Sequence, residues 1–568
     1  MTHQRKIALF AAGGLLALLL LAAVALVLFL EGKALKPRLE AAASDALGME
    51  VRIGGRLGIG LFPGLHLTLE DVRIRNRGAD VASAKETILG IELLPLLHKE
   101  LRIVKIGMKR PRISIEQDRD GKFNFQTSEE EAGKKSEEAK GTRFSLDVTK
   151  ISLSDGALFS ADRKTGEALE AGDFTLDVSR LRLAGGKKSD LLSNLSFAAE
   201  FGCKEFRKGG LAVSNLKLRI EGKDGRYGIR PVTASRLVHS GPGGKVTADR
   251  LALTVDNLVI GGDEKADLLR RISFSGTAGI GEIRTENFVI SDLASAVAGK
   301  DGVLDLHQVA MRLFGGQGSG SLRADVSGSV PRYHLRYSLS KFRVEEFLKA
   351  LSPKNVGAGS MDLSTTLSMR GKTANEMKRT ANGEFSLRGE NLRLDGVDLD
   401  RRFSRYEATQ SLNLVDVGVF FIAGPFAPLI TKGYSFASLF RGSDGSTSIR
   451  VLVSDWKVEH GIARAKDVAL ATNENRIALI GNLDFVNERF DDVTMAMVDG
   501  QGCAKVRQRI RGSFSKPEVE KVSFLQTAAG PVITLLKQAK KLFGGRCKVF
   551  YDGSVAPPEG GQSHRFLP

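Results

Sequence analysis

The chain has 568 residues, a mass of 61.3 kDa and a formal net charge of +17. A positive charge of this size favours anionic polymers or anionic lipid surfaces as partners, although a solvated basic exterior explains it equally well. Nucleic acid is not an expected partner, because the basic residues are spread along the chain rather than gathered beside aromatic stacking platforms.

Residues 1–31 predict a transmembrane anchor. About two dozen apolar residues run from Ile7 to Leu30, and roughly 20 helical residues cross a hydrocarbon core about 30 Å thick. The small residues Ala23–Ala25 also fit a signal-peptide cleavage site, but the apolar run continues past them. We therefore expect an uncleaved anchor, with the bulk of the chain outside the cytoplasm.

Beyond the anchor, one helix is expected before the sequence turns to strands. Ala34–Leu47 has apolar residues near one helical face, and Gly48 is a stop signal. From Glu50 the apolar residues alternate with polar ones, which predicts strands. A frame shift at Glu70–Asp71 predicts a bulge or a tight turn, and a short apolar helix is expected over Ile91–Leu97.

The same alternation returns in block after block, so the chain is predicted to be mainly β, with one elongated, curled antiparallel sheet and short capping helices. A second sheet could cover its apolar face, or the apolar faces could line a groove for acyl chains. Periodicity does not distinguish these arrangements. The expected regions are the anchor 1–31, an N-terminal β region 32–126, a charged linker or mobile loop 127–142, a middle β region 143–300, a C-terminal β region 301–520, and a capping helix with a tail, 521–568.

The chain has three cysteines and no metal or cofactor motif. A bridge between Cys503 and Cys547 would staple the C-terminal end and contribute about 3 to 4 kcal/mol, but the sequence leaves open whether it forms. Cys203 would stay free. The eight histidines are scattered singly, so no metal site is expected. The glycine-rich stretch 315–320 predicts a turn rather than a phosphate loop, because it lacks the Lys-Ser/Thr ending.

Pro531–Phe543 predicts an amphipathic helix. Its apolar stripe comprises Val532, Leu535, Leu536, Leu542 and Phe543, with lysines on the other side. This helix could lie on an anionic membrane surface or cap the last strand edge of the sheet. The apolar stretch 424–430 is a second candidate cap or entry lip.

Several segments resemble the AsmA family of bacterial envelope proteins. They are the anchor, Val51–Gly55, Leu61–Val72, Pro111–Glu116, Asp120–Asn124, Leu313–Gly318, Gly383–Leu387, Gly396–Leu399 and the closing Gly512–Val519. The middle region, roughly residues 145 to 300, is similar only in pattern. The resemblance implies a protein anchored in the inner membrane, with its bulk in the periplasm and a sheet that curls into a lipid-binding groove. It also implies a role in phospholipid transport or outer-membrane lipid homeostasis, and no enzymatic activity.

On this basis the expected ligand is a phospholipid or another acyl lipid. The residues predicted from alternation to line the groove near its base are Leu65, Leu67, Leu69, Ile113 and Ile115. The alternative function is a scaffold or assembly factor that contacts outer-membrane proteins through strand edges. A hydrolase is the third and weakest hypothesis, because no Gly-x-Ser-x-Gly elbow is present.

Overall fold

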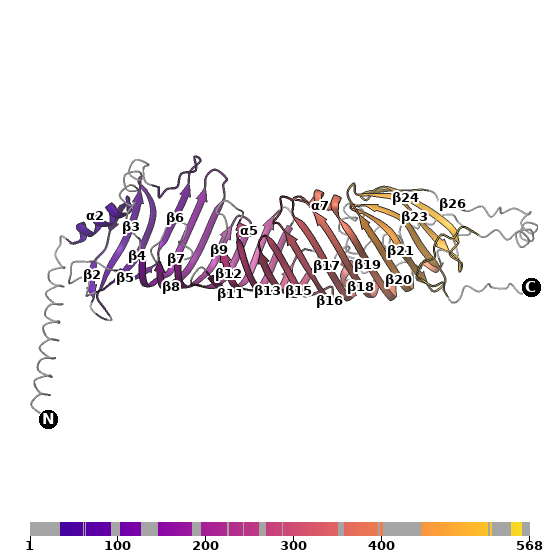
Figure 1. Cartoon of the computed structure of the whole chain (residues 1–568), viewed down its shortest axis with the longest axis horizontal. Helices are drawn as coiled ribbons and strands as arrows, with labels where there is room; N and C mark the ends of the chain where they lie inside the picture. The colour runs from indigo at the N-terminus through magenta and orange to yellow at the C-terminus, as the bar shows by residue number, and fades with distance from the viewer. Residues whose placement is uncertain are drawn as a thin grey trace, which may run out of the picture. The chain divides into compact units, whose positions relative to one another are not determined.

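The structure, a computed structural model, divides into two compact units, Met1–Ile260 and Gly261–Pro568, which are taken in turn (Figure 1). The division falls inside the expected middle region 143–300. The described residues are 35–60, 62, 64–92, 103–126, 146–183, 195–223, 226–241, 244–260, 268–286, 288–349, 357–395, 398–401, 445–520, 523–524 and 547–558.

Some predicted elements lie outside the described residues. They are the anchor from Ile7 to Leu30, the linker 127–142, nearly all of the short helix Ile91–Leu97, the stretch 424–430 and the helix Pro531–Phe543. Among the described helices, none is long and apolar enough to cross a membrane.

The first unit consists of one helix followed by strands. Helix α2 spans Leu35–Leu47, close to the predicted range, and Gly48 follows it with a φ of 65°. The strands are β1 (Glu50–Ile53), β2 (Leu57–Gly60), β3 (His66–Asn76), β4 (Ala79–Ile91), β5 (Ile103–Lys109), β6 (Arg112–Gln117), β7 (Leu146–Asp162), β8 (Ala168–Leu183), β9 (Leu195–Lys208), β10 (Leu211–Lys223), β11 (Arg226–Gly241) and β12 (Gly244–Ile260).

Helix α2 covers the outer edge of β1. Ser44 Oγ accepts a hydrogen bond from the Val51 N–H at 2.9 Å, and Glu40 Oε1 accepts one from the Ile53 N–H at 2.7 Å. Among the described strands β1 pairs with β3 alone, so these N–H groups lie at a sheet edge. The helix therefore satisfies backbone donors that would otherwise attract another strand.

Strands β5 and β6 are two halves of one interrupted strand. Both pair antiparallel with β4 and parallel with β7. Arg110, with a φ of 50°, and Pro111 separate them, and proline cannot donate to a strand ladder. The predicted antiparallel sheet therefore contains parallel pairings at this one place among the described strands. A crossover connection, which parallel pairing requires, precedes β7.

The second unit holds further strands and three described short helices. The helices are α5 (Leu268–Arg271), α6 (Val344–Lys349) and α7 (Ala374–Thr380). The strands are β13 (Ile272–Arg284), β14 (Val289–Lys300), β15 (Val303–Leu313), β16 (Gly316–Asp325), β17 (Arg332–Arg343), β18 (Gly357–Arg370), β19 (Asn382–Asp395), β20 (Ser446–Glu459), β21 (Ile462–Thr472), β22 (Arg476–Asp484), β23 (Arg489–Val498), β24 (Ala504–Ser513), β25 (Lys516–Val519) and β26 (Ser523–Phe524).

Aspartate and asparagine residues introduce bulges within the strands. Residues with a φ between 49° and 54° inside strands include Asp71, Asp155, Asp173, Asn215, Asn257, Asp292, Asn391 and Asp492. These two residue types tolerate the left-handed conformation best after glycine, and a bulge bends and twists its strand. At the predicted frame shift Asp71 has a φ of 50°, and the bulge lies on the strand opposite, where Gly55 and Arg56 both face Glu70.

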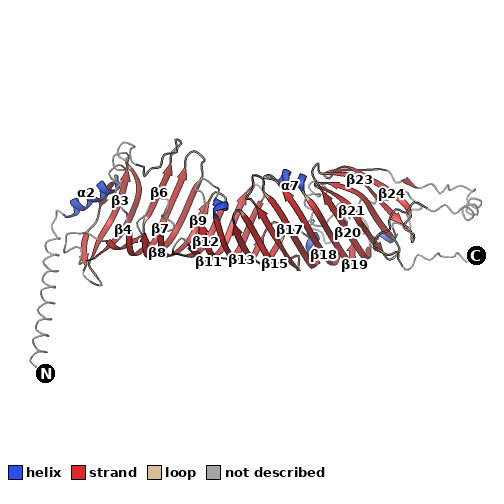
Figure 2. Ribbon diagram, in the orientation of Figure 1, coloured by secondary structure: helices blue, strands red, loops and turns tan. Residues whose placement is uncertain are grey.

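The mainly β prediction is confirmed, and within each unit the strands form one layer (Figure 2). Consecutive strands pair side by side, and no described strand belongs to a second sheet packed face to face on the first. The described strands therefore do not form the two-sheet sandwich that the sequence left open.

Candidate functional site: the apolar face of the sheet

A continuous row of apolar residues crosses the first unit from strand to strand. Each member is paired directly with the next across neighbouring strands, so all lie on one face of the sheet. This central row consists of Ile59, Leu67, Leu89, Ile106, Ile151, Val178, Ala199, Ile220, Ile229 and Val255. It extends from β2 to β12 without a polar residue.

Two further rows flank the central row. The first contains Leu69, Thr87, Met108, Leu153, Leu176, Phe201, Leu218, Val232 and Leu253. The second contains Val51, Ile74, Ala82, Ile113, Leu158, Ala171, Phe206, Val213, Leu237 and Ala248. Members of both pack together in one cluster, Leu153 and Phe201 with Ile113 and Leu158, so the two rows share a face. Thr87 is the one polar member.

The apolar face of the first unit is only partly covered. Eight of the ten residues in the central row are half-buried, and Leu67 and Ala199 are each 8% exposed. Leu253, in the first flanking row, is 37% exposed. A hollow on this unit is lined in part by Ala82, Ile113, Leu158 and Ala171 of the second flanking row. A contiguous apolar surface left in solvent marks a ligand or partner site.

The second unit has its own apolar row, open at one end and covered at the other. The row consists of Val297, Leu306, Leu322, Leu335, Leu367, Gly383, Val458, Ala463, Leu483 and Phe490. Leu306, Leu322, Leu335 and Leu367 are half-buried and line a hollow. Further along, Ala463 and Leu483 are both 0% exposed. The apolar face is therefore accessible from β14 to β18 and covered from β20 onward.

A solid core closes the C-terminal part of the second unit. Trp456 is 1% exposed, and its ring stacks on Phe385 with centroids 5.9 Å apart. Helix α6 contributes Val344 and Leu348, which are 1% and 2% exposed. The apolar side chains in this part of the second unit therefore form a packed core and are not accessible to a ligand.

Residues 547–558, here called the strap, cover the opposite face of β20 to β23. Tyr551 and Val555 of the strap are 6% and 1% exposed. They pack in one cluster with small residues of the strands, Ala469, Ala471, Ala478 and Ala496. A disulfide joins Cys547, at the start of the strap, to Cys503, with their Cα atoms 6.1 Å apart. This is the pairing considered from the sequence, and Cys203 remains a free, buried thiol.

Asp467 is the polar anchor of the strap. Its carboxylate accepts hydrogen bonds from the hydroxyls of Tyr551 and Ser554, both at 2.6 Å. Burial tends to raise the pKa of Asp467, but these hydrogen bonds outweigh it and hold the pKa below the usual carboxyl value. Arg476 donates to the Val555 carbonyl at 2.9 Å and lies 5.5 Å from the centre of the Tyr551 ring.

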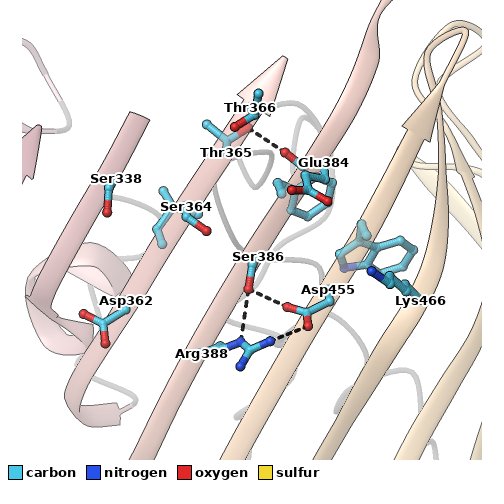
Figure 3. Close-up of a pocket in the computed structure, with 13 residues that line it drawn as sticks. Ser338, Asp362, Ser364, Thr365, Thr366, Glu384, Ser386, Arg388, Asp455 and Lys466 are labelled. Atoms are coloured by element: carbon cyan, nitrogen blue, oxygen red, sulfur yellow. Dashed lines mark hydrogen bonds and ion pairs between the residues drawn. The ribbon is translucent and has the colours of Figure 1, made fainter. Parts of the chain in front are cut away.

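A polar hollow lies over β17 to β21 (Figure 3). Ser338, Ser364, Ser386 and Asp455 form a row across it. The Ser386 hydroxyl donates to Asp455, and Arg388 Nη2 lies 2.7 Å from Asp455 Oδ2. The residues that line this hollow include no histidine, so Ser386 has no imidazole base beside it in the lining. The network ties β19 to β20 on the polar face.

The five residues predicted to line a groove fall at different places on the apolar face. Leu67, Leu69 and Ile113 each belong to one of the three rows. Leu65 directly precedes β3 and is 7% exposed. Its carbonyl accepts a hydrogen bond from the N–H of Ile91, the last residue of β4 in the same hairpin. Ile115 lies at the margin of the apolar face. The residues paired with it across the following strands are Ser160, Leu169 and Lys208, two of which are polar.

Other members of the rows had no clear signal in the sequence. The apolar positions of β9 include the small residues Ala199 and Cys203, which blur the alternation. In β11 two register shifts around the cis Arg230–Pro231 bond break the period, so that Ile229 and Val232 fall out of phase. Among the described residues, no group of three or more His, Cys, Asp or Glu could hold a metal ion.

The fold and its apolar face can be set beside known proteins. The profile of the AsmA family matches residues 1–234 and 264–468, which is more than half of the chain. The chain belongs to the AsmA family. The family match includes much of the middle region, whose sequence resembles the family only in its pattern of alternation. The closing stretch Gly512–Val519 lies outside the match. A search among curated proteins found no match.

Proposed function

We propose that this AsmA-family protein binds the acyl chains of phospholipids on the apolar face of its sheet and takes part in phospholipid transport or outer-membrane lipid homeostasis. The observation that carries the proposal is the set of three rows that cross β3 to β12, apolar in all but Thr87 and left half-covered. No covalent chemistry is required of such a surface, and we propose that the protein is not an enzyme.

The size of the apolar face suits acyl chains. Ten strands at a spacing of about 4.8 Å give a row roughly 43 Å long, whereas a hydrocarbon core about 30 Å thick accommodates two opposed acyl chains. More than one chain therefore fits along the first unit. Each methylene removed from water contributes about 0.8 kcal/mol, so a lipid gains several kcal/mol on this face without any specific contact.

The proposed location follows from the family and the N-terminal sequence. The apolar run from Ile7 to Leu30 would anchor the chain in a bacterial inner membrane, with the sheet in the periplasm. A sheet that begins beside a bilayer can receive acyl chains from it.

Photo-crosslinking with the full chain tests the proposal. A benzophenone amino acid would replace Leu176, which is half-buried in the first flanking row, or its neighbour Thr175, which is exposed on the other face of β8. In bacterial cells labelled with radioactive phosphate, a phospholipid adduct is expected at position 176 and none at position 175. Adducts to proteins without lipid at both positions would refute lipid binding and support the assembly-factor hypothesis.

A further inference from the structure

The hairpin formed by β2 and β3 has an apolar tip. From Leu57 to Leu65 the sequence reads LGIGLFPGL, which contains no polar side chain. Phe62 is 89% exposed, whereas the other exposed large apolar side chains of the described residues are between 37% and 52% exposed. Hairpin tips in water usually carry Asn, Asp or Ser beside Gly and Pro. An apolar tip of this kind indicates a contact with something outside the sheet.

His66 fixes the conformation of the tip. Its Nδ1 donates a hydrogen bond to the Gly64 carbonyl at 2.8 Å, and its ring occupies the space where a Cβ of Gly60 would lie. Leu65, directly before β3, is buried. The turn is therefore attached to the sheet on both strands, and the exposure of Phe62 is a property of the folded hairpin.

Helix α2 runs antiparallel to β1 and begins beside the start of β2. Its direction follows from three hydrogen bonds between helix side chains and the backbone, which join Ser44 to Val51, Glu40 to Ile53 and Lys36 to Gly55. Positions four apart in the helix thus match positions two apart in the strand, and both spacings are about 6 to 7 Å. Strands β1 and β2 run in the same direction, because both pair antiparallel with β3. From Gly55 to Gly60 the chain therefore extends about 16 Å past the beginning of α2.

The predicted anchor ends close to the same place. Only residues 31–34 separate the apolar run that ends at Leu30 from Leu35, the first residue of α2. A fully extended chain of this length spans about 17 Å at most, which is close to the extension of the hairpin beyond α2. The first turn of α2 also carries Lys36 and Arg38 and no acidic residue, and such cations are attracted to anionic headgroups. The hairpin tip and the bilayer surface are therefore expected at the same level.

We propose that the tip of the β2–β3 hairpin inserts into the interface of the bilayer that holds the anchor, with the Phe62 ring among the acyl chains next to the headgroups. Interfacial elements bury apolar side chains about 5 to 10 Å deep in this region. The inference goes beyond the proposed function, because it depends on the predicted anchor and not on lipid binding by the sheet. Ile59, close to the tip, is the first member of the central row, so the apolar face begins at the bilayer surface.

Fluorescence quenching by brominated lipid tests the inference. The full chain with Phe62→Trp is reconstituted in vesicles of phosphatidylethanolamine and phosphatidylglycerol, with or without phosphatidylcholine that carries bromine at a shallow or a deep acyl position. We expect the brominated lipid to quench the additional fluorescence of this chain, and the shallow bromines to quench it more than the deep ones. Trp456 is 1% exposed in the core of the second unit, so the wild-type chain gives an unquenched background.

The matched control is Ala79→Trp, at an exposed position beside the turn between β3 and β4. This turn lies about 33 Å from the tip, since β3 joins the two ends. The control should be quenched no more than the wild type. Equal quenching of both variants would overturn the inference, as would unquenched emission from Phe62→Trp at the wavelength of indole in water. A shift to shorter wavelength without quenching would show a contact between copies of the chain and would also overturn it.

A second background separates the bilayer from lipid bound on the sheet. The measurement is repeated with Phe62→Trp combined with Ile113→Glu, a substitution in the second flanking row. Quenching at position 62 should persist, because insertion of the tip does not depend on that row. Quenching that disappears would assign the signal to lipid on the apolar face and overturn the inference, while leaving the proposed lipid binding intact. Persistent quenching in a chain that retains no lipid on the sheet would refute only the proposed function.

Discussion

Cutting the disulfide between Cys503 and Cys547 should destabilise the C-terminal part of the second unit. The bond closes a loop over a sequence separation of 44 residues. The chain-entropy relation gives about 4 kcal/mol for a loop of that length, lost when Cys547→Ser removes the cross-link. The noncovalent contacts of the strap through Tyr551 and Arg476 remain in the variant, so the strap should stay bound but open more often.

The single tryptophan provides the assay. Trp456 lies in the core of the second unit and is 1% exposed, so its fluorescence reports unfolding of that unit. In urea, a loss of about 4 kcal/mol with a slope of about 3 kcal/mol per molar lowers the midpoint by roughly 1 M. The oxidised wild type treated with reductant should shift by the same amount as Cys547→Ser.

Cys503→Ser serves as the control, because a protein without the bond should not respond to reductant. Cys203 is free and buried in the first unit, so it should not contribute. If the oxidised and reduced midpoints coincide within experimental error, the strap does not cross-link the cooperative unit and the reasoning fails.

Three further predictions follow from the same contacts and rows. Because the folded-state pKa of Asp467 lies below the usual carboxyl value, its stabilisation of the strap is complete above that value and is lost as the pH falls through the folded-state pKa; hydrogen exchange of the strap should show this acid sensitivity, and Asp467→Asn should abolish it. Gly383→Ala should cost roughly 2 kcal/mol or more, since the residue has a φ of 145° and a Cβ there would overlap the Thr366 carbonyl; an unchanged urea midpoint by Trp456 fluorescence would contradict this. Ile113→Glu should remove bound lipid from the folded protein, which mass spectrometry of organic extracts measures, and lipid retained at the wild-type level would show that this row is not the lipid path.

The alternation of apolar and polar residues was sufficient to predict a mainly β chain. Period-two patterning reports which residues share a face of a strand, and this information is local. The same is true of helix α2 and its stop at Gly48, and of the frame shift at Glu70–Asp71, because each depends on a few neighbouring residues. The family resemblance, carried by short motifs such as Val51–Gly55, is likewise written in the sequence.

The register between strands is not local, and only the tertiary structure decided it. The central row joins Leu67 to Ile106, Ile151 and Ile220, and a shift of one residue at any pairing would have moved a polar side chain onto the face. The parallel pairing of β7 with β5 and β6 could not be read from alternation, which is the same for both strand directions.

The strap depends on tertiary structure for the same reason. Asp467 and Tyr551 meet because the chain returns across the sheet after its last strand. Sequence pattern specifies which side chains each strand offers to a face, whereas pairing between distant segments decides which of them become neighbours.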